Sequence, residues 1–343
     1  MANNFYSLTV KELIRETKNT VSIVFDIPSA LAVDFKYKAG HYLTLKLIMN
    51  GEEVRRSYSI SSYGNEPLKV SCKMIPGGKM STYLFEKLGV GDQVDVMAPM
   101  GNFTVKNPSK DVVLFAAGSG ITPIISILKQ TLATTNQRVQ LYYGNRSEEE
   151  IIFKAELEQL RAENSDRLMV QHFLSSNGER LDSERVQSIV SGIGDDKKNC
   201  DYFICGPEGM IAAVKSGLES SNLLDEQIHI EYFGSPKVEK AAVETVAASG
   251  DVNDIVAVID GEEHAITLEE GESILDGANR IGIDPPFSCQ SGVCTTCKCK
   301  VQSGEVDMEN NFGLGEDEVE EGFILSCISK PKTAGVKVNW DEV

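Results

Sequence analysis

The stretch Cys289-Gln-Ser-Gly-Val-Cys294-Thr-Thr-Cys297 sets three cysteines in the spacing C-x4-C-x2-C, and a fourth, Cys327, follows in a separate segment. A plant-type [2Fe–2S] cluster takes four thiolates in this order, three of them from one loop. The residues between the cysteines are mostly small or polar, so backbone N–H groups can turn toward anionic sulfur. We therefore expect Cys289, Cys294, Cys297 and Cys327 to hold a [2Fe–2S] cluster.

Three other kinds of cysteine site fit this pattern less well. A zinc site usually shows paired C-x2-C motifs or histidine ligands. No histidine lies between Cys289 and Cys327, which also argues against a Rieske centre. Disulfides are possible for the eight cysteines, but the N-terminal residues show no secretory signal, which argues against them. Cys299 is expected to be a small residue of the strand after the loop and not a fifth ligand.

Length and composition indicate a globular protein of several domains. A chain of 343 residues is too long for one ordinary core, and its residues are 41% hydrophobic and 24% charged. The most apolar run, 112–128, is interrupted by Gly118, Gly120 and Pro123, so it makes a poor membrane span and a good strand, loop and helix. We expect a cytoplasmic protein without a membrane partner.

The charge of the chain is negative and unevenly distributed. The net charge of −18 argues against nucleic acid as a partner, because phosphate binding needs a basic surface. Residues 253–343 alone hold 19 acidic and 6 basic side chains. This acidic segment either serves solubility or steers the chain toward a basic face of an electron acceptor, and the sequence leaves both open.

The first hundred residues have the pattern of a small β-barrel. Strand-like runs at 7–16, 20–27, 41–49, 53–59, 68–74 and 93–98 are separated by turn signals, of which Asn50-Gly51 is a strong hairpin signal. Only the run 80–88 is typical of a helix. Several short strands at this spacing favour a closed antiparallel sheet.

The next part of the chain alternates strands with helices. Buried-type strands are expected at 112–117, 139–144, 168–174 and 201–205, with helices at 123–133, 151–163, 183–191 and 208–220. This alternation predicts a parallel, doubly wound sheet. Residues 236–252 lack aromatic side chains and have the composition of a linker. The last part is expected to contain a hairpin about Asp260-Gly261 and a helix at 273–280.

Two motifs in the first part are suited to a flavin nucleotide. Arg56-Ser57-Tyr58-Ser59 ends a strand, where a cation, hydroxyls and an aromatic ring can contact phosphate and ring. The segment from Pro76 to Thr82 leads glycines into a helix, whose free N–H groups can bind a pyrophosphate. Taken alone, the tetrapeptide is also compatible with an ordinary polar strand end.

Two motifs in the second part are suited to a further nucleotide. Gly118-Ser119-Gly120-Ile121-Thr122-Pro123 joins a buried strand to a helix, a usual anion site, but the proline departs from the Rossmann fingerprint. Cys205-Gly206-Pro207 ends a later strand. Without the context of the other motifs, Cys205 is more readily interpreted as a buried thiol at the end of the strand.

The order of these motifs resembles the ferredoxin–NADP reductase superfamily with a C-terminal plant-type ferredoxin, and the resemblance covers nearly the whole chain apart from the linker. It implies an antiparallel β-barrel FAD domain at 1–106, an α/β Rossmann-like NAD(P)-binding domain at 107–235, a linker at 236–252 and an α+β β-grasp ferredoxin domain at 253–343. Within the family the likeness is greatest to reductases of di-iron epoxidases that act in aromatic degradation.

The resemblance also implies roles for individual residues. Ser59, Cys205 and Glu231 would be catalytic, with Cys205 beside the nicotinamide and Glu231 helping with proton balance. His41 would lie near the flavin edge or simply end a strand as a polar residue. FAD would contact Arg56, Ser57, Tyr58, Ser59, Gly77, Gly78, Met80, Ser81 and Thr82, and the pyridine nucleotide would contact Gly118, Ser119, Gly120, Thr122, Pro123, Asn145, Arg146, Ser147, Cys205, Gly206 and Pro207.

The choice of pyridine nucleotide depends on Asn145-Arg146-Ser147 at a strand end. NADH-specific sites often carry an acid there, whereas Arg146 and Ser147 can bind a 2′-phosphate. The sequence therefore predicts NADPH over NADH. The acids at 148–150 are expected to begin the next helix, whose dipole favours them.

The expected function is electron supply from NADPH through FAD and the [2Fe–2S] cluster to a partner oxygenase. No 2-His-1-carboxylate or haem motif is visible, so the oxygenase is expected to be another protein. A di-iron oxygenase, a Rieske oxygenase and a desaturase all remain open as acceptors, as does NADH as donor. Two alternatives come from other classes: a ferredoxin-type carrier fused to an inert domain, and a structural subunit whose cluster only stabilises the fold.

Overall fold

The computed structural model describes residues 5–234 and 252–343. These residues form two units: a larger one of residues 7–54 and 58–233, and a smaller one that contains the C-terminal third with residues 5–6 and 55–57. The predicted linker, 236–252, lies outside the described residues except for Val252. In the described part of the chain, no helix is both long and apolar enough to cross a membrane.

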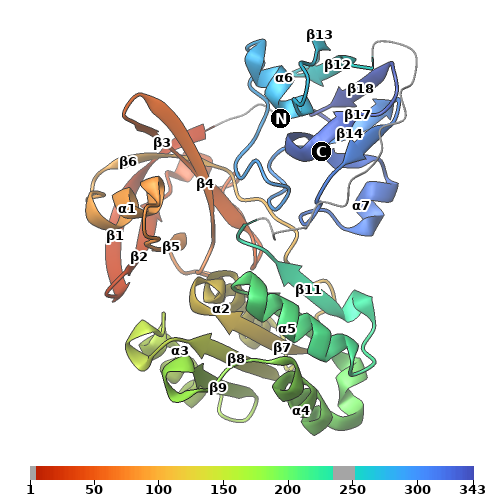
Figure 1. Ribbon diagram of the computed structural model, residues 1–343. Helices are drawn as coiled ribbons and strands as arrows, with labels where there is room; N and C mark the ends of the chain where they lie inside the picture. The colour runs from red at the N-terminus through yellow and green to blue at the C-terminus, as the bar shows by residue number, and fades with distance from the viewer. Residues whose placement is uncertain (1–4, 235–251) are drawn as a thin grey trace. The chain divides into compact units, whose positions relative to one another are not determined.

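The first sheet is antiparallel and has six strands in the order β4-β3-β6-β1-β2-β5 (Figure 1). Asn50 and Gly51 both have positive φ, 53° and 83°, as the predicted two-residue hairpin turn requires. Past the end of β4, Ile60 pairs with Val70 of β5, so the two edges of the sheet meet and the predicted barrel is confirmed. The strands are β1 Phe5–Thr17, β2 Thr20–Asp26, β3 Tyr42–Met49, β4 Glu52–Ser59, β5 Lys69–Lys73 and β6 Gln93–Met97, with one helix, α1 Lys79–Glu86.

Alternate residues of these strands face a closed apolar interior. Leu43, Leu45, Val94 and Val96 are fully or almost fully buried, at two-residue spacing along β3 and β6. On the opposite side of β3 and β6, Lys46 and Asp95 form an ion pair at 3.5 Å. The barrel thus follows directly from the alternation in the sequence.

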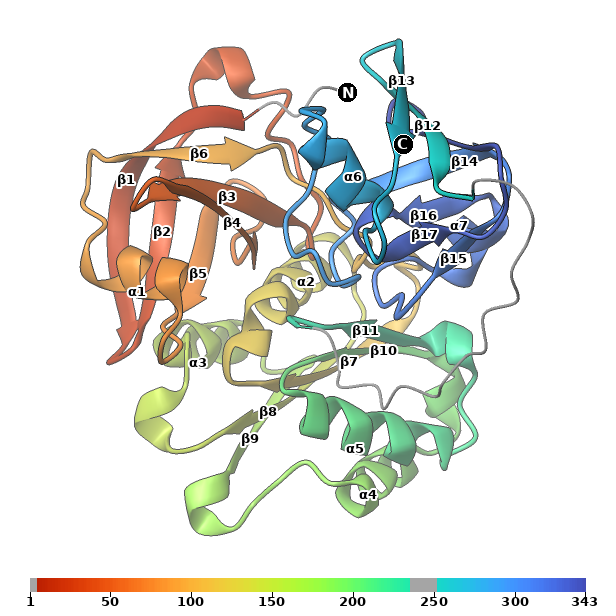
Figure 2. The same ribbon diagram turned by 45° about the horizontal axis from the view of Figure 1, so that its top comes forward.

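The second sheet is parallel, with the order β11-β10-β7-β8-β9. Helices α2 and α3 pack on one face and α4 and α5 on the other, which Figure 2 shows and which confirms the doubly wound prediction. The elements are β7 Asp111–Ala117, α2 Ile121–Thr134, β8 Val139–Asn145, α3 Lys154–Glu163, β9 Leu168–Leu174, α4 Ser183–Ile193, β10 Cys200–Cys205, α5 Glu208–Glu219 and β11 Ile228–Glu231.

The segment between β8 and α3 differs from the expectation. Residues Glu148–Glu150 form a short 3-10 turn of their own, and α3 begins only at Lys154. The cause is Phe153, which is buried and adopts a left-handed φ of 60°, so the chain cannot run on as one helix. The prediction that the three acids begin the helix is therefore wrong.

The smaller unit contains a five-stranded sheet in the order β13-β12-β18-β14-β16, packed against α6. In it, β12 pairs in parallel with β18 and antiparallel with β13, the mixed pairing of a β-grasp. Asp260 and Gly261 have positive φ, so the predicted hairpin is confirmed. The elements are β12 Asp254–Ile259, β13 Glu262–Thr267, α6 Ile274–Arg280, β14 Lys298–Ser303, β15 Val306–Met308, α7 Glu316–Glu320, β16 Phe323–Leu325, β17 Ser329–Pro331 and β18 Val336–Asn339.

Candidate functional site

The four cysteines of the predicted cluster site come together in the smaller unit. The Cys289 thiol is within hydrogen-bonding contact of Cys294 and Cys327, and Cys327 also contacts Cys297. Backbone N–H groups turn toward the sulfurs: Cys294 N donates to Cys289 Sγ at 3.3 Å, and Cys289 N to Cys294 Sγ at 3.5 Å. Four gathered thiols with donors around them fit the core of a [2Fe–2S] cluster.

The backbone of the cluster loop depends on one glycine. Gly292 has a φ of 73°, and a Cβ there would lie 2.6 Å from Asn310 O and 2.8 Å from Ile328 Cδ1. A side chain would therefore push the loop away from the neighbouring chain. The N–H of Gly292 faces Cys327, so the same close approach brings a donor to the fourth thiol.

Cys299 lies in β14 with no exposed surface and packs in the apolar core of the smaller unit with Trp340 and Val338. Within the described residues, no three His, Cys, Asp or Glu side chains converge as ligands of a single ion do. A cluster with two irons takes two thiolates per iron and does not need such convergence. The arrangement agrees with four ligands and leaves Cys299 outside them.

The segment predicted to bind flavin ends β4. Ser59 is almost fully buried, Tyr58 is half-buried and contacts the Cys72 thiol, and Arg56 is exposed. Burial raises the pKa of Cys72 to about 11, so this thiol stays neutral beside the tyrosine. His41 is half-buried, and its carbonyl accepts a hydrogen bond from Ile60 N at 2.8 Å, which puts its backbone beside this segment.

The start of α1 has the features of an anion site. Gly78 caps the helix without any side-chain cap, and the first turn carries no acid. Ser81 Oγ accepts from Ile75 N at 3.1 Å, and a Cβ at Gly78 would lie 2.5 Å from this oxygen, so a side chain there would disturb this hydrogen bond. Free N–H groups at an acid-free helix start suit a pyrophosphate.

The glycine loop between β7 and α2 is fixed by close backbone packing. A Cβ at Gly120 would lie 2.0 Å from the carbonyl oxygen of Cys205, so only glycine fits there. Tyr143 donates its hydroxyl to Gly118 O at 2.9 Å, and Thr122 donates to Ser119 O at 3.0 Å. The loop therefore meets the end of β10 directly and presents the N-terminus of α2.

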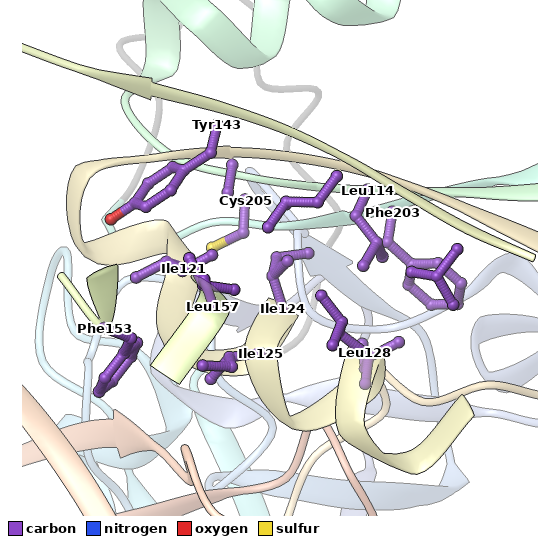
Figure 3. Close-up of a cluster of buried hydrophobic side chains, with 14 of the residues drawn as sticks. Leu114, Ile121, Ile124, Ile125, Leu128, Tyr143, Phe153, Leu157, Phe203 and Cys205 are labelled. Carbon is purple, nitrogen blue, oxygen red and sulfur yellow. The ribbon is translucent and has the colours of Figure 1, made fainter. Parts of the chain in front are cut away.

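Cys205 and Glu231 are neighbours across the β10–β11 pairing. Cys205 has no exposed surface, and Figure 3 shows its sulfur beside Ile121 within the apolar cluster. Glu231 is half-buried overall, but its Oε2 is enclosed and has no hydrogen-bond partner among residues 5–234 and 252–343, and burial raises the pKa of this carboxyl to about 8. Burial also raises the pKa of Cys205, so both groups carry protons at neutral pH.

Asn145 ends β8 and is buried, while Arg146 is exposed. The Ser147 hydroxyl donates to Glu149 Oε2 at 2.6 Å, so a carboxylate lies at this edge as well. Ser176 N donates to Arg146 O at 2.9 Å, which ties the loops after β8 and β9 together.

Sequence reasoning missed Lys73, which lies at the end of β5. Its Nζ would be 3.8 Å from a Cβ at Gly118 and lies 3.5 Å from Glu150 Oε2. The barrel thus brings a cation to the glycine loop of the second sheet.

Comparison with known proteins agrees with this organisation. Residues 7–105 match the oxidoreductase FAD-binding domain, residues 114–216 the oxidoreductase NAD-binding domain, and residues 257–332 the 2Fe-2S iron-sulfur cluster binding domain. The chain is 36% identical to a subunit of 1,2-phenylacetyl-CoA epoxidase from Escherichia coli strain K12, over 98% of each chain. The chain belongs to the ferredoxin–NADP reductase superfamily.

Other relatives also match this chain over nearly its whole length. The ferredoxin reductase component of 3-ketosteroid-9-alpha-monooxygenase from Rhodococcus rhodochrous is 34% identical over 97% of this chain and 96% of its own. The reductase subunit of glycine betaine monooxygenase from Pseudomonas aeruginosa PAO1 is 31% identical over 96% and 94%. Phthalate dioxygenase reductase shares the fold, with a TM-score of 0.61 and 23% identity over 98% of each chain. The chain is therefore an NAD(P)H-dependent oxidoreductase with FAD and 2Fe-2S domains.

Proposed function

We propose that this chain takes a hydride from NADPH onto FAD and passes the electrons one at a time through a [2Fe–2S] cluster to a partner oxygenase. The observation that carries this proposal is the gathered cysteine quartet, on the same chain as two helices that begin directly after glycines. FAD would supply the conversion of a two-electron hydride into single electrons, and the cluster would supply a one-electron exit.

The residues of the barrel would hold FAD. The pyrophosphate would lie at the start of α1, against Gly77, Gly78 and the N–H groups of Met80, Ser81 and Thr82. Arg56 would pair with phosphate, Ser57 and Ser59 would bond the flavin, and Tyr58 would stack on it. His41 would contribute at the flavin edge, next to the segment that its carbonyl already holds.

Cys205 and Glu231 would act on the nicotinamide side. The neutral thiol of Cys205 presents no charge that would repel or trap the nucleotide, and it would position the ring with Gly206 and Pro207. Glu231, with its pKa raised to about 8 by burial, would hold a proton near neutral pH and could pass it on as charge changes nearby. Ser59, the third residue predicted to be catalytic, would act through its bond to the flavin.

NADPH is the proposed donor. Exposed Arg146 would bind the 2′-phosphate with Asn145 and Ser147, and Gly118, Ser119, Gly120, Thr122 and Pro123 would hold the pyrophosphate. The contact of Ser147 with Glu149 favours the alternative, NADH, because a carboxylate there can accept from ribose hydroxyls.

Arg146→Ala separates the two donors. Loss of one charge-assisted bond, about 1.5–3 kcal/mol, should raise the KM for NADPH roughly 10- to 100-fold with little change for NADH. Equal loss with both nucleotides would contradict the role of Arg146. The measurement is steady-state cytochrome c reduction with each nucleotide.

The proposed partner is a di-iron phenylacetyl-CoA epoxidase, an enzyme of aromatic degradation, and the proposed location is the cytoplasm. The relatives named above are components of an epoxidase, a steroid monooxygenase and a betaine monooxygenase, so those two monooxygenases are alternatives. A Rieske oxygenase of another kind and a desaturase, which the sequence also leaves open, are further alternatives. Aerobic turnover with each purified oxygenase tests this choice. The partner should support substrate-dependent NADPH consumption, and consumption without product would point to another acceptor.

Two readings from other classes make different predictions. A ferredoxin-type carrier fused to an inert domain would not reduce cytochrome c with NADPH. A structural subunit would keep its visible absorbance when NADPH is added without oxygen. The proposed reductase differs from each of them: with NADPH it should reduce cytochrome c, and its visible absorbance should be bleached.

A further inference from the structure

Lys129 is a buried cation in the middle of α2. Its side chain is 6% exposed, in a helix most of whose positions are buried. An unpaired ammonium in such a place would cost several kcal/mol, so its partners determine what it does.

The partners of Lys129 come from both domains of the larger unit. Its Nζ donates to Glu66 Oε2 at 2.8 Å and to the carbonyl oxygen of Ser61 at 3.2 Å, both in the barrel domain. It also pairs with Glu156 Oε1 of α3 in the nucleotide-binding domain. The other oxygen of Glu156 lies 3.6 Å from Lys69 Nζ, on β5 of the barrel.

These four charges form a chain, Glu66–Lys129–Glu156–Lys69, that alternates in sign and has no net charge. It passes from the barrel to the nucleotide-binding domain and back. Glu16 lies close enough to sense Lys69, Lys129 and Glu156, and burial raises its pKa. The network is therefore an interdomain contact centred on a buried lysine, with its two carboxylates partly exposed.

A second contact on α2 reaches the same barrel segment. Ser126, one turn before Lys129, donates to the carbonyl oxygen of Ser62 at 2.9 Å. Two consecutive carbonyls, of Ser61 and Ser62, are thus held by one face of one helix. The segment they belong to begins at Ser59, the residue proposed to contact the flavin.

The other end of α2 is the nucleotide site. The helix begins directly after Gly120, whose backbone packs on Cys205. Lys129 lies nine positions after Gly120, a rise of about 14 Å along the helix. A rigid helix therefore joins the loop proposed for the pyridine nucleotide to the segment proposed for the flavin.

We propose that Lys129 is a positioning residue for hydride transfer, which fixes the nucleotide loop relative to the flavin segment through Ser61, Glu66 and Glu156. This inference rests on the proposed function. Hydride transfer needs the reacting atoms about 3–3.5 Å apart, and a 1 Å misplacement can cost about 100-fold in rate. Buried ion networks add little stability compared with apolar packing, so geometry is the better explanation of this one.

The test compares three variants with wild type by anaerobic stopped flow, using NADPH or NADH, whichever reduces the wild-type flavin faster. Lys129→Met should lower the limiting rate of flavin reduction at least about 10-fold while the nucleotide Kd stays within about twofold. Glu66 and Glu156 are 39% and 31% exposed, so their carboxylates stay partly hydrated and the variant is expected to fold.

The triple variant Lys129→Met, Glu66→Gln and Glu156→Gln removes Lys129 together with both carboxylates that pair with it, and leaves Lys69 near the carboxyl of Glu16. Its thermal midpoint, measured on FAD-free protein, should return toward that of wild type, while the rate stays low. Lys110→Met is the matched control: it removes a 2.9 Å pair to buried Asp201 inside the nucleotide-binding domain. It should lower the thermal midpoint and leave the rate unchanged.

Three outcomes would overturn the inference: an unchanged rate in Lys129→Met, recovery of the rate together with stability in the triple variant, or an equal loss of rate in Lys110→Met. If Lys129→Met does not fold, the rate of flavin reduction in the triple variant tests the inference instead: a low rate supports it, and a wild-type rate overturns it. Wild-type flavin that neither nucleotide reduces would instead refute the proposed function.

Discussion

Gly120→Ala is the sharpest local perturbation of the proposed nucleotide site. A Cβ at this position would lie 2.0 Å from Cys205 O, 2.4 Å from Cys205 C and 2.7 Å from Gly206 N. All three atoms are backbone, so no side chain can rotate away. Either the start of α2 or the end of β10 must move.

The size of the movement follows from these distances. Real Cβ atoms essentially never approach closer than 3.0 Å, so the gap must open by at least the missing ångström. A shift of 1 Å between reacting groups can cost about 100-fold in rate. Overpacking in a tight contact also costs about 1–3 kcal/mol of stability. Gly120→Ala should therefore reduce flavin roughly 100-fold more slowly and unfold at a lower urea concentration.

The assay is anaerobic flavin reduction over a range of NADPH concentrations, with urea unfolding in parallel. Gly192→Ala, near the end of α4, is the control, because nothing lies within 4 Å of a Cβ there. It should raise stability by up to about 1 kcal/mol and leave the rate unchanged. A wild-type rate in Gly120→Ala would refute the idea that this contact sets the nucleotide geometry.

Two further predictions concern buried titratable groups and cysteines. Burial raises the pKa of Glu231 to about 8, so between about pH 4.5 and pH 8 the folded chain keeps a proton that the unfolded chain has lost. The contribution of the protonated Glu231 carboxyl to the stability of the fold is therefore full below about pH 4.5 and is lost as the pH rises toward 8. Relative to Glu231→Gln, the free energy of unfolding of wild type should fall by on the order of 4 kcal/mol between about pH 5 and pH 8, and parallel urea-unfolding profiles would contradict this. Cys299→Ala should keep two irons per chain and Cys294→Ser should lose them, as iron analysis and visible absorbance would show; loss of iron in Cys299→Ala would make that thiol a ligand.

Local signals in the sequence predicted most of the fold. Asn50-Gly51 and Asp260-Gly261 predicted hairpins because few other residue pairs accept two positive φ values, and both turns have them. The alternation of buried strands with helices between 112 and 220 predicted a parallel sheet for a similar local reason. Local chemistry determines these features, so a single sequence is enough to find them.

The misses depend on tertiary contacts. Phe153 has a left-handed backbone conformation and a buried ring, and this separates the turn Glu148–Glu150 from helix α3. No local sequence pattern predicts that separation. Strand β11 has only four half-buried residues, too few for a periodic signal. Glu231 is visible in the sequence as part of a domain end, but its pairing with Cys205 depends on sheet order.

The residues of the candidate site also fall into those that the sequence predicted and those that it did not. The cysteine spacing and glycine loops were visible because each motif lies within a few residues. Lys73 and Lys129 could not be found in this way, because their contacts are with segments distant in sequence. Lys73 lies near Gly118, and Lys129 donates hydrogen bonds to Ser61 and Glu66. Such pairings become visible only when the two domains are folded together.

The most direct test of the central claim is anaerobic mixing of the chain, loaded with FAD and iron–sulfur cluster, with NADPH, followed by visible absorbance and electron paramagnetic resonance. The account predicts rapid bleaching of the flavin and then a rhombic signal from a reduced [2Fe–2S] cluster in the same molecules. Flavin reduction without that signal, or no bleaching with either nucleotide, would contradict an electron path from pyridine nucleotide to the cysteine loop.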